Sequence, residues 1–155
     1  MPRRAFPATS CRSCQTLSIM NDPRSIIEAR KFGEIRYAVV SEGTGDMSRV
    51  LGKLGLTADA ALLVEHDKKS AFCILRELLW KDMAYESECM PKSQAEEIAS
   101  YVLQQHSIPE SKYFSNGDWS KRESWNPLTE STFDAGLVVT GGNGTYFCIW
   151  FQDED

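Results

Sequence analysis

The residues of this chain that could do acid–base chemistry are its two histidines, His66 and His106. His66 lies between Glu65 and Asp67, and a histidine beside carboxylates can act as a general base or as a metal ligand. Neighbours on a strand point to opposite faces, so this triplet at the end of a predicted strand does not bring the three side chains together. We favour the alternative, a turn that leads into the next helix with Asp67 or Ser70 as its cap.

Five cysteines offer a second possible chemistry. Cys11 and Cys14 form a C-x-x-C pair, but a zinc site needs four suitably spaced ligands, and Cys73, Cys89 and Cys148 supply no second pair. A thioredoxin-like motif would open a helix in a βαβ unit, whereas this pair precedes every predicted element. We therefore expect no metal, no redox chemistry and no other cofactor. The odd count without a disulfide pattern favours a cytoplasmic location.

Motifs for nucleotide binding and acyl transfer are also missing from the sequence. Gly43-Thr44-Gly45 precedes a short predicted helix, whose N-terminus could hold an anion, but the G-x-G-x-x-G and P-loop patterns are absent. Asp46 would also put negative charge where a phosphate would lie. No G-x-S-x-G elbow occurs, and no Ser/His/Asp set can be assembled. The sequence predicts a protein that is not an enzyme.

The charge balance excludes further classes. Acidic residues outnumber basic ones by 22 to 17, which gives a net charge of −5. Residues 1–20 hold three arginines and no acid, so the rest of the chain has 14 basic and 22 acidic side chains and a net charge of −8. Nucleic-acid binding relies on Lys and Arg, so we expect no nucleic-acid partner. No apolar run approaches the roughly 20 residues that span a bilayer, so we expect no membrane partner.

Acidic residues recur in the C-terminal region, where we expect them to cluster in space: Glu130, Asp134, Asp153, Glu154 and Asp155. One interpretation is a solvated surface that keeps the protein soluble. The other is a negative patch that docks a basic protein, which would speed association and select partners. Aromatic anchors would add affinity, and the candidates are Trp119, Trp125 and Trp80.

Local patterns predict the elements that must position these residues. Residues 1–19 are expected to be disordered or to precede the true start at Met20, and residues 20–155 to form one domain. Apolar periodicity and capping residues predict helices from Pro23 to about Gly33, from Met47 to Leu54, from Ser70 to about Met83, and from a Ser93-x-x-Glu96 capping box to about Gln105. Ile35–Ser41 and Ala60–Glu65 are predicted strands, the second one buried, and 113–132 is a predicted loop.

The C-terminal segment predicts a β-hairpin. Gly136–Thr140 leads into the turn Gly141-Gly142-Asn143-Gly144, and Thr145–Phe151 returns. Both faces of the returning strand are apolar, so we expect it to be sandwiched between two layers. At a sheet edge this strand would also support pairing with a second copy, so a monomer or weak dimer is expected. The fold class is α+β: a single domain with a small, mostly antiparallel sheet, a C-terminal β-hairpin and three to four packed helices.

The segment 125–155, WNPLTESTFDAGLVVTGGNGTYFCIWFQDED, resembles the C-terminal end of small bacterial immunity proteins from toxin–immunity systems of the contact-dependent-inhibition type. The segment KDMAY at 81–85, with Met-Pro at 90–91, is similar to another part of the same family pattern. In outline the resemblance covers residues 25–155. It implies a non-enzymatic cytoplasmic protein that binds and neutralises a cognate toxin domain. Contact surfaces vary between cognate pairs, so the resemblance assigns no individual contact residue.

The expected function is therefore that of an immunity protein, which covers the active site of a basic toxin domain, such as a nuclease, with an acidic surface. Two alternatives remain open. One is a small hydrolase or transferase that uses His66 or His106, with residues 113–132 as a lid. The other is a housekeeping adaptor without a toxin partner.

Overall fold

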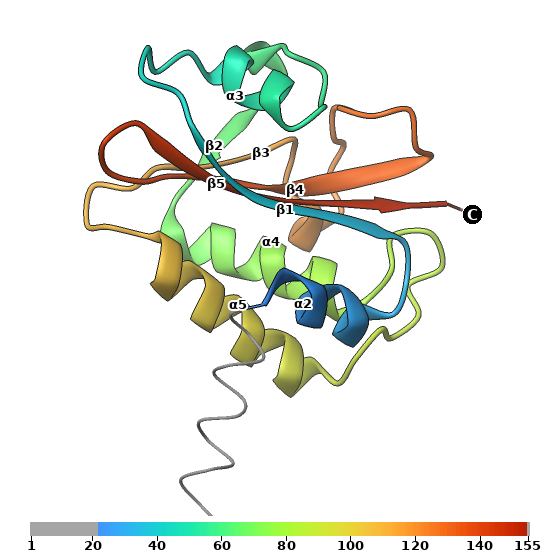
Figure 1. The fold of residues 1–155 in the computed structure, drawn as a ribbon. Helices are drawn as coiled ribbons and strands as arrows, with labels where there is room; N and C mark the ends of the chain where they lie inside the picture. The colour runs from blue at the N-terminus through green and yellow to red at the C-terminus, as the bar shows by residue number, and fades with distance from the viewer. Residues whose placement is uncertain (1–21, 155) are drawn as a thin grey trace, which may run out of the picture.

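A five-stranded antiparallel sheet is the middle layer of the fold, with helices on both faces (Figure 1). This computed structural model describes residues 22–154. The sheet has the order β1-β5-β4-β3-β2, and its strands are β1 (Glu34–Ser41), β2 (Val64–His66), β3 (Tyr113–Ser115), β4 (Phe133–Thr140) and β5 (Thr145–Asp153). The α-helices are α2 (Pro23–Arg30), α3 (Met47–Lys53), α4 (Lys68–Trp80) and α5 (Lys92–His106). Two 3-10 turns, η1 (Ala60–Leu62) and η2 (Trp119–Lys121), complete the elements.

The predicted α+β class and the C-terminal hairpin are confirmed. β4 and β5 pair in register from Phe133 opposite Asp153 to Thr140 opposite Tyr146. β5 also pairs with β1 from Thr145 to Gln152, so it lies inside the sheet and not at an edge. The edges are β1 and β2, and any strand pairing with a second copy would have to use one of these.

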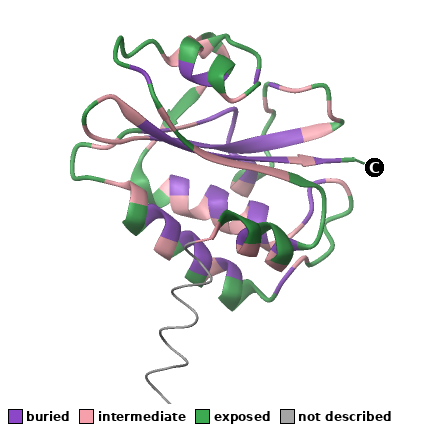
Figure 2. Ribbon diagram, viewed as in Figure 1, coloured by how far each residue is buried: buried purple, intermediate pink, exposed green. Residues whose placement is uncertain are grey.

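The two faces of β5 belong to two separate cores, as the alternation predicted. Phe147, Ile149 and Phe151 pack into the larger cluster with α4 and α5. The other face of β5 contributes to a smaller cluster with Val50 and Leu51 of α3. Figure 2 shows β4 and β5 as a buried band between the helical layers. Burying a large apolar side chain stabilises a fold by about 1.5–3 kcal/mol, so β5 is a major source of stability.

Helix boundaries follow from capping and from buried stripes. Asp22, Asp46 and Asp67 each accept a hydrogen bond from a backbone N–H in the first turn of the helix that follows, which confirms the predicted starts of α2 and α3 and sets that of α4. The buried positions recur at helical spacing: Ala71, Ile74, Leu75, Leu78 and Leu79 in α4, and Ala95, Ile98, Ala99, Val102 and Leu103 in α5. None of the helices in the described residues is long and apolar enough to cross a bilayer.

Three local predictions are wrong. Residues 60–65 were predicted to form one buried strand, but they form η1 and the first part of β2. The turn η1 forms because the Asp59 side chain accepts a hydrogen bond from the N–H of Ala61, and β2 is an edge strand because it pairs only with β3. α5 starts after Pro91 without a side-chain cap, so Ser93 lies inside the first turn and the capping box does not form. The predicted loop 113–132 contains β3, which is too short to show a period-2 pattern in the sequence.

A close approach between β4 and β5 yields a stability prediction. A Cβ atom at Gly136 would overlap the indole of Trp150 and the carbonyl oxygen of Ile149. We expect Gly136→Ala to lower the free energy of unfolding by about 1–3 kcal/mol, because overpacking forces neighbouring groups to shift. Gly43→Ala is the matched control, since a Cβ there meets no atom within 4 Å, and it should change stability by less than about 0.5 kcal/mol. Urea denaturation measures both, and equal midpoints would contradict the prediction.

Candidate functional site

The structure divides the predicted acidic patch between the surface and the interior. Glu130 and Glu154 are exposed, whereas Asp134 and Asp153 are fully buried. Asp155 lies outside the described residues. The prediction of one surface patch is therefore wrong for Asp134 and Asp153, which have structural roles.

Glu130 and Glu154 line the same cleft, which has a volume of about 610 Å³ and lies beside Gly55 and Leu128. Arg36 of β1 also lines it. Its guanidinium donates to the carbonyl oxygen of Leu54 at 2.8 Å and to Oε1 of Gln152 at 3.0 Å, so neither carboxylate neutralises it through a direct contact.

The carboxylate of Glu154 is held in place at the rim of this cleft. The hydroxyl of Thr132 donates to Oε1 of Glu154 at 2.7 Å, and the Thr132 N–H also points to this carboxylate. These hydrogen bonds, with one from Ser131, lower the pKa of Glu154. Glu154 therefore places a fixed negative charge in this cleft at neutral pH, beside the positive charge of Arg36.

Asp134 ties the loop that carries Glu130 to the sheet. Its carboxylate accepts hydrogen bonds from the N–H groups of Leu128 and Thr129, at 3.0 Å each, and from the Thr129 hydroxyl at 2.9 Å. The indole N–H of Trp150 and the side-chain amide of Asn116 donate to the same carboxylate. A carboxylate with this many donors tolerates full burial. Asp134 therefore holds one side of the cleft from the protein interior, and its own carboxylate is not exposed at the surface.

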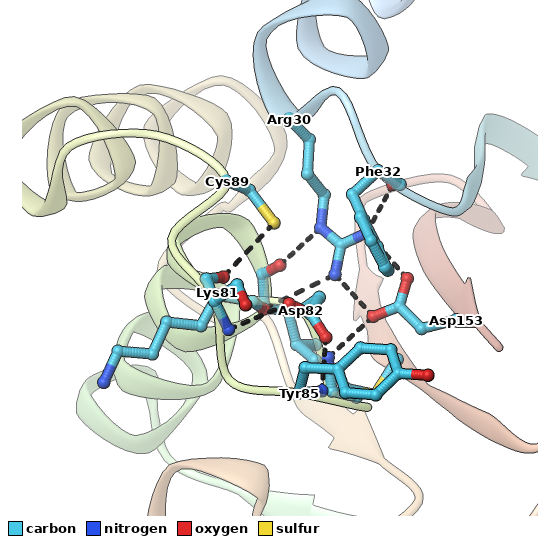
Figure 3. Close-up of polar contacts among 10 residues, drawn as sticks. Arg30, Phe32, Lys81, Asp82, Tyr85, Cys89 and Asp153 are labelled. Carbon is cyan, nitrogen blue, oxygen red and sulfur yellow. Dashed lines mark hydrogen bonds and ion pairs between the residues drawn. The ribbon is translucent and has the colours of Figure 1, made fainter. Parts of the chain in front are cut away.

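Asp153 has a similar structural role on the opposite side of the sheet, where it forms a buried, bidentate ion pair with Arg30 (Figure 3). The two N···O distances are 2.8 and 2.7 Å. The N–H of Met83 also donates to Asp153, and Nε of Arg30 donates to the carbonyl oxygen of Leu78. The pair therefore joins α2, the end of α4 and the end of β5. Removing one partner of such a pair typically costs about 3–5 kcal/mol.

The loop after α4 is fixed by a third buried carboxylate, Asp82 (Figure 3). Asp82 accepts hydrogen bonds from the N–H groups of Tyr85 and Ser87. The side chain of Tyr85 is 63% exposed. This loop is thus a well-ordered surface feature.

The surface is less negative than the composition indicates. Among the described residues, five acidic side chains are buried but only one basic side chain, Arg30, is buried. The buried acids are Glu42, Asp82, Asp118, Asp134 and Asp153. Glu42 is paired with Lys53, and its pKa is lowered to about 2, first by the hydrogen bond with Lys53 and then by that with Thr44. Much of the excess acid serves the fold and does not form a docking surface.

The side chains of the tryptophans are also less exposed at the surface than predicted. Trp119 is 7% exposed and packs edge-to-face against Trp125, with ring centroids 6.0 Å apart. The prediction of Trp119 as a surface anchor is therefore wrong. Trp125 and Trp80 are half-buried. The Trp80 indole donates to Glu88 and lies under Lys81, so it is engaged within the chain.

The two histidines lie in different surroundings. His66 lines a second cleft, of about 630 Å³, together with Glu65 and Asp67. Its Nε2 is 3.1 Å from the carbonyl oxygen of Gly117, and because a carbonyl only accepts, Nε2 carries the proton in the neutral ring. His106 stacks on Phe147 at 3.8 Å, and burial lowers its pKa. Nε2 of His106 also lies 3.2 Å from the Tyr37 hydroxyl, so packing and a hydrogen bond within the chain both hold this ring.

The described part of the chain contains three cysteines, Cys73, Cys89 and Cys148, and none of them is in a disulfide. No three His, Cys, Asp or Glu side chains within residues 22–154 are grouped so that they could hold a metal ion. Burial raises the pKa of the Cys148 thiol, which is unfavourable for a nucleophile. Cys11 and Cys14 lie outside the described residues.

The sequence predicted that Glu130 and Glu154 cluster, and both line this cleft, but it did not predict Arg36 beside them. The available signal was its place in the strand pattern, since Arg36 is a charged residue between the apolar Ile35 and Tyr37. Comparison of the chain with protein-family models, curated proteins and solved structures found no match.

The contrast between buried and exposed carboxylates can be measured. We expect Asp134→Ala to lower the free energy of unfolding by about 3 kcal/mol or more, because it leaves buried donors without an acceptor. Glu130→Ala should change it by less than about 0.5 kcal/mol, since Glu130 is exposed. Chemical denaturation compares the two variants, and a similar loss in both would show that this division of roles is wrong.

Proposed function

We propose that this chain is an immunity protein, which binds a cognate toxin domain and covers its active site. The observation that carries the proposal is the cleft in which Glu130 and Glu154 come together. They are two of the acidic residues that the sequence pointed to, and the resemblance of residues 125–155 to immunity proteins falls on the same region. The proposal includes a cytoplasmic location and no catalytic role.

The chemistry of the cleft favours a basic partner. Glu154 stays ionised because Thr132 and Ser131 donate to it, and Glu130 adds a second carboxylate to the lining of the cleft. A toxin that cleaves nucleic acid must bind phosphate, and it does so with Lys and Arg. A cleft with two carboxylates can accept such a side chain and block access to the phosphate site. Charges of this kind raise the association rate and select the partner.

The rigidity of the cleft supports a binding role. Asp134 holds Leu128 and Thr129, and Leu128 is itself buried in the smaller core. Asn126 donates to the backbone of Asn116, which fixes the other end of the same loop. A loop that is ordered before binding loses little conformational entropy when the partner arrives. The buried part of the predicted patch therefore helps recognition indirectly.

The double variant Glu130→Gln/Glu154→Gln tests the cleft. We expect it to bind the toxin encoded by the neighbouring gene at least tenfold more weakly than the unmodified protein, because it removes both carboxylates and keeps their shape. Calorimetric titration measures the affinity, and growth of toxin-exposed cells measures protection. The matched control is Glu28→Gln/Glu97→Gln, which makes the same charge change at exposed positions on α2 and α5.

The control should bind within about twofold of the unmodified protein. Equal weakening by both pairs would assign the effect to net charge and reject the cleft as the site. No complex on gel filtration and no protection of cells by the unmodified protein would reject the immunity function itself.

The second candidate function, a small hydrolase or transferase, is favoured by one observation. His66 lines a cleft together with two carboxylates, which is the arrangement that this alternative needs. The contact of Nε2 with Gly117 leaves Nδ1 as the acceptor that would take a proton. His106 has no such setting.

Assays with model phosphodiester and ester substrates separate the two functions. Under our proposal, the unmodified protein shows no turnover above background, and His66→Asn protects cells as well as the unmodified protein does. Turnover that His66→Asn abolishes and His106→Asn retains would establish the enzyme and overturn the immunity proposal.

A further inference from the structure

The strand β1 is the longer edge of the sheet and has no strand on its outer side among the described residues. It has eight residues, whereas the opposite edge strand, β2, has three. The N–H of Glu42 donates to the carbonyl oxygen of Gly144, one step beyond the pair Ser41–Thr145. Bonded and outward positions alternate in an antiparallel pair, so the backbone groups of Ile35, Tyr37 and Val39 point outward.

Exposed apolar side chains occur on β1 and on the segment that precedes it. Six large hydrophobic residues of the described chain are exposed, and three of them belong to α2, β1 and the link between them: Ile27, Phe32 and Val39. Val39 is 57% exposed, the largest exposed fraction among the aliphatic ones. It shares its side of the sheet with Tyr37, which packs on Phe147. Ile35, Tyr37 and Val39 thus form an apolar row that is exposed at Val39 and half-buried at the other two residues. An apolar row beside unpaired backbone groups is typical of a strand that pairs with another chain.

The usual protections of an edge strand are weak here. β1 contains no proline, and its one basic residue, Arg36, is turned inward toward Leu54 and Gln152. Lys53 donates to the carbonyl oxygen of Ser41 and so covers only the last residue of the strand. Within residues 22–154, most of the outer edge of β1 is therefore unpaired.

We propose that two copies of this chain pair through β1 as antiparallel strands, which joins their sheets across a two-fold axis. The register that overlaps the whole strand places Tyr37 opposite Tyr37 of the second copy. Ile35 then lies opposite Val39, and Gly33 lies opposite Ser41. In this register the outward backbone groups of one copy meet the outward groups of the other, as an antiparallel ladder requires.

The side chains fit this register on both faces of the sheet. On the α4–α5 face, Val39 covers Ile35 of the second copy, which buries apolar surface now exposed to water. On the α3 face, Glu34 of one copy comes next to Lys53 of the other, because Lys53 lies at Ser41, and it adds a second carboxylate to the ion pair that Lys53 forms with Glu42. The two-fold axis repeats this charge pair. Such self-complementarity favours a second copy over an unrelated extended peptide as the occupant.

The dimer is expected to be weak. Pairing of two eight-residue strands buries much less accessible surface than the roughly 800 Å² that each partner buries in a standard protein–protein interface. A dissociation constant on the order of 0.1 mM is therefore expected, and the effect is visible only at high protein concentration.

Sedimentation equilibrium of the full chain, from about 0.01 to 1 mM, tests the proposal. We expect Val39→Lys to weaken dimerisation at least tenfold, because it places two charges in the apolar row. Val64→Lys is the matched control, since Val64 is a valine of 45% exposure on the other edge strand. The control should dimerise like the unmodified protein.

Three outcomes would overturn the proposal: an unmodified protein that stays monomeric over this range, equal dimerisation of Val39→Lys, or loss of the dimer in Val64→Lys. Circular dichroism shows whether Val39→Lys is folded. If it is not, amide hydrogen exchange of the unmodified protein tests the dimer instead. The amides of Ile35, Tyr37 and Val39 should then exchange at least tenfold more slowly at 1 mM than at 0.01 mM, and unchanged rates would overturn the proposal.

Discussion

The burial of β5 on both faces is the constraint on which the rest of the structure depends. One face of this strand needs α4 and α5 as a cover, and the other needs α3 and the loop that contains Leu128. Both edges of β5 are paired as well, with β1 and with β4. Because β5 is covered on both faces and paired along both edges, water reaches its polar groups only at the two ends of the strand. The charged groups near these ends, such as Asp153, must therefore find partners inside the protein.

Buried carboxylates connect this core to its periphery. Asp134 and Asp153 lie at the same end of the sheet, since they occupy neighbouring register positions on β4 and β5, but their side chains lie on opposite faces. One organises the loop below the acidic cleft, and the other joins α2 to the end of α4. An acidic composition can thus reflect structural anchors as much as an attractive surface. The proposed partner would meet only the carboxylates that remain outside, chiefly those of the cleft.

Local patterns predicted the elements whose signals lie within one segment. The caps at Asp22 and Asp46, the apolar stripes of α4 and α5, and the alternation of Tyr146 to Phe151 were all readable, because each depends on short-range geometry. The order of the strands in the sheet could not be predicted in this way, since it is set by pairing between distant segments. The burial of Asp134 and Trp119 could not be predicted for the same reason. The sheet brings Asn116 to Asp134 and Phe133 to Trp119 from distant parts of the sequence. Glu130 and Glu154 were predicted to cluster, and the structure places them in one cleft.

The place of β5 in the chain has a consequence for biosynthesis. This strand leaves the ribosome after every other element of the described fold, yet it is the one that β1 and β4 both need. The earlier segments can form helices as they emerge, but neither hydrophobic cluster can close before residues 145–153 are outside the exit tunnel. A nascent chain that stalls within β4 would expose the apolar faces of α4 and α5 together, and it would be a natural substrate for chaperones and proteases.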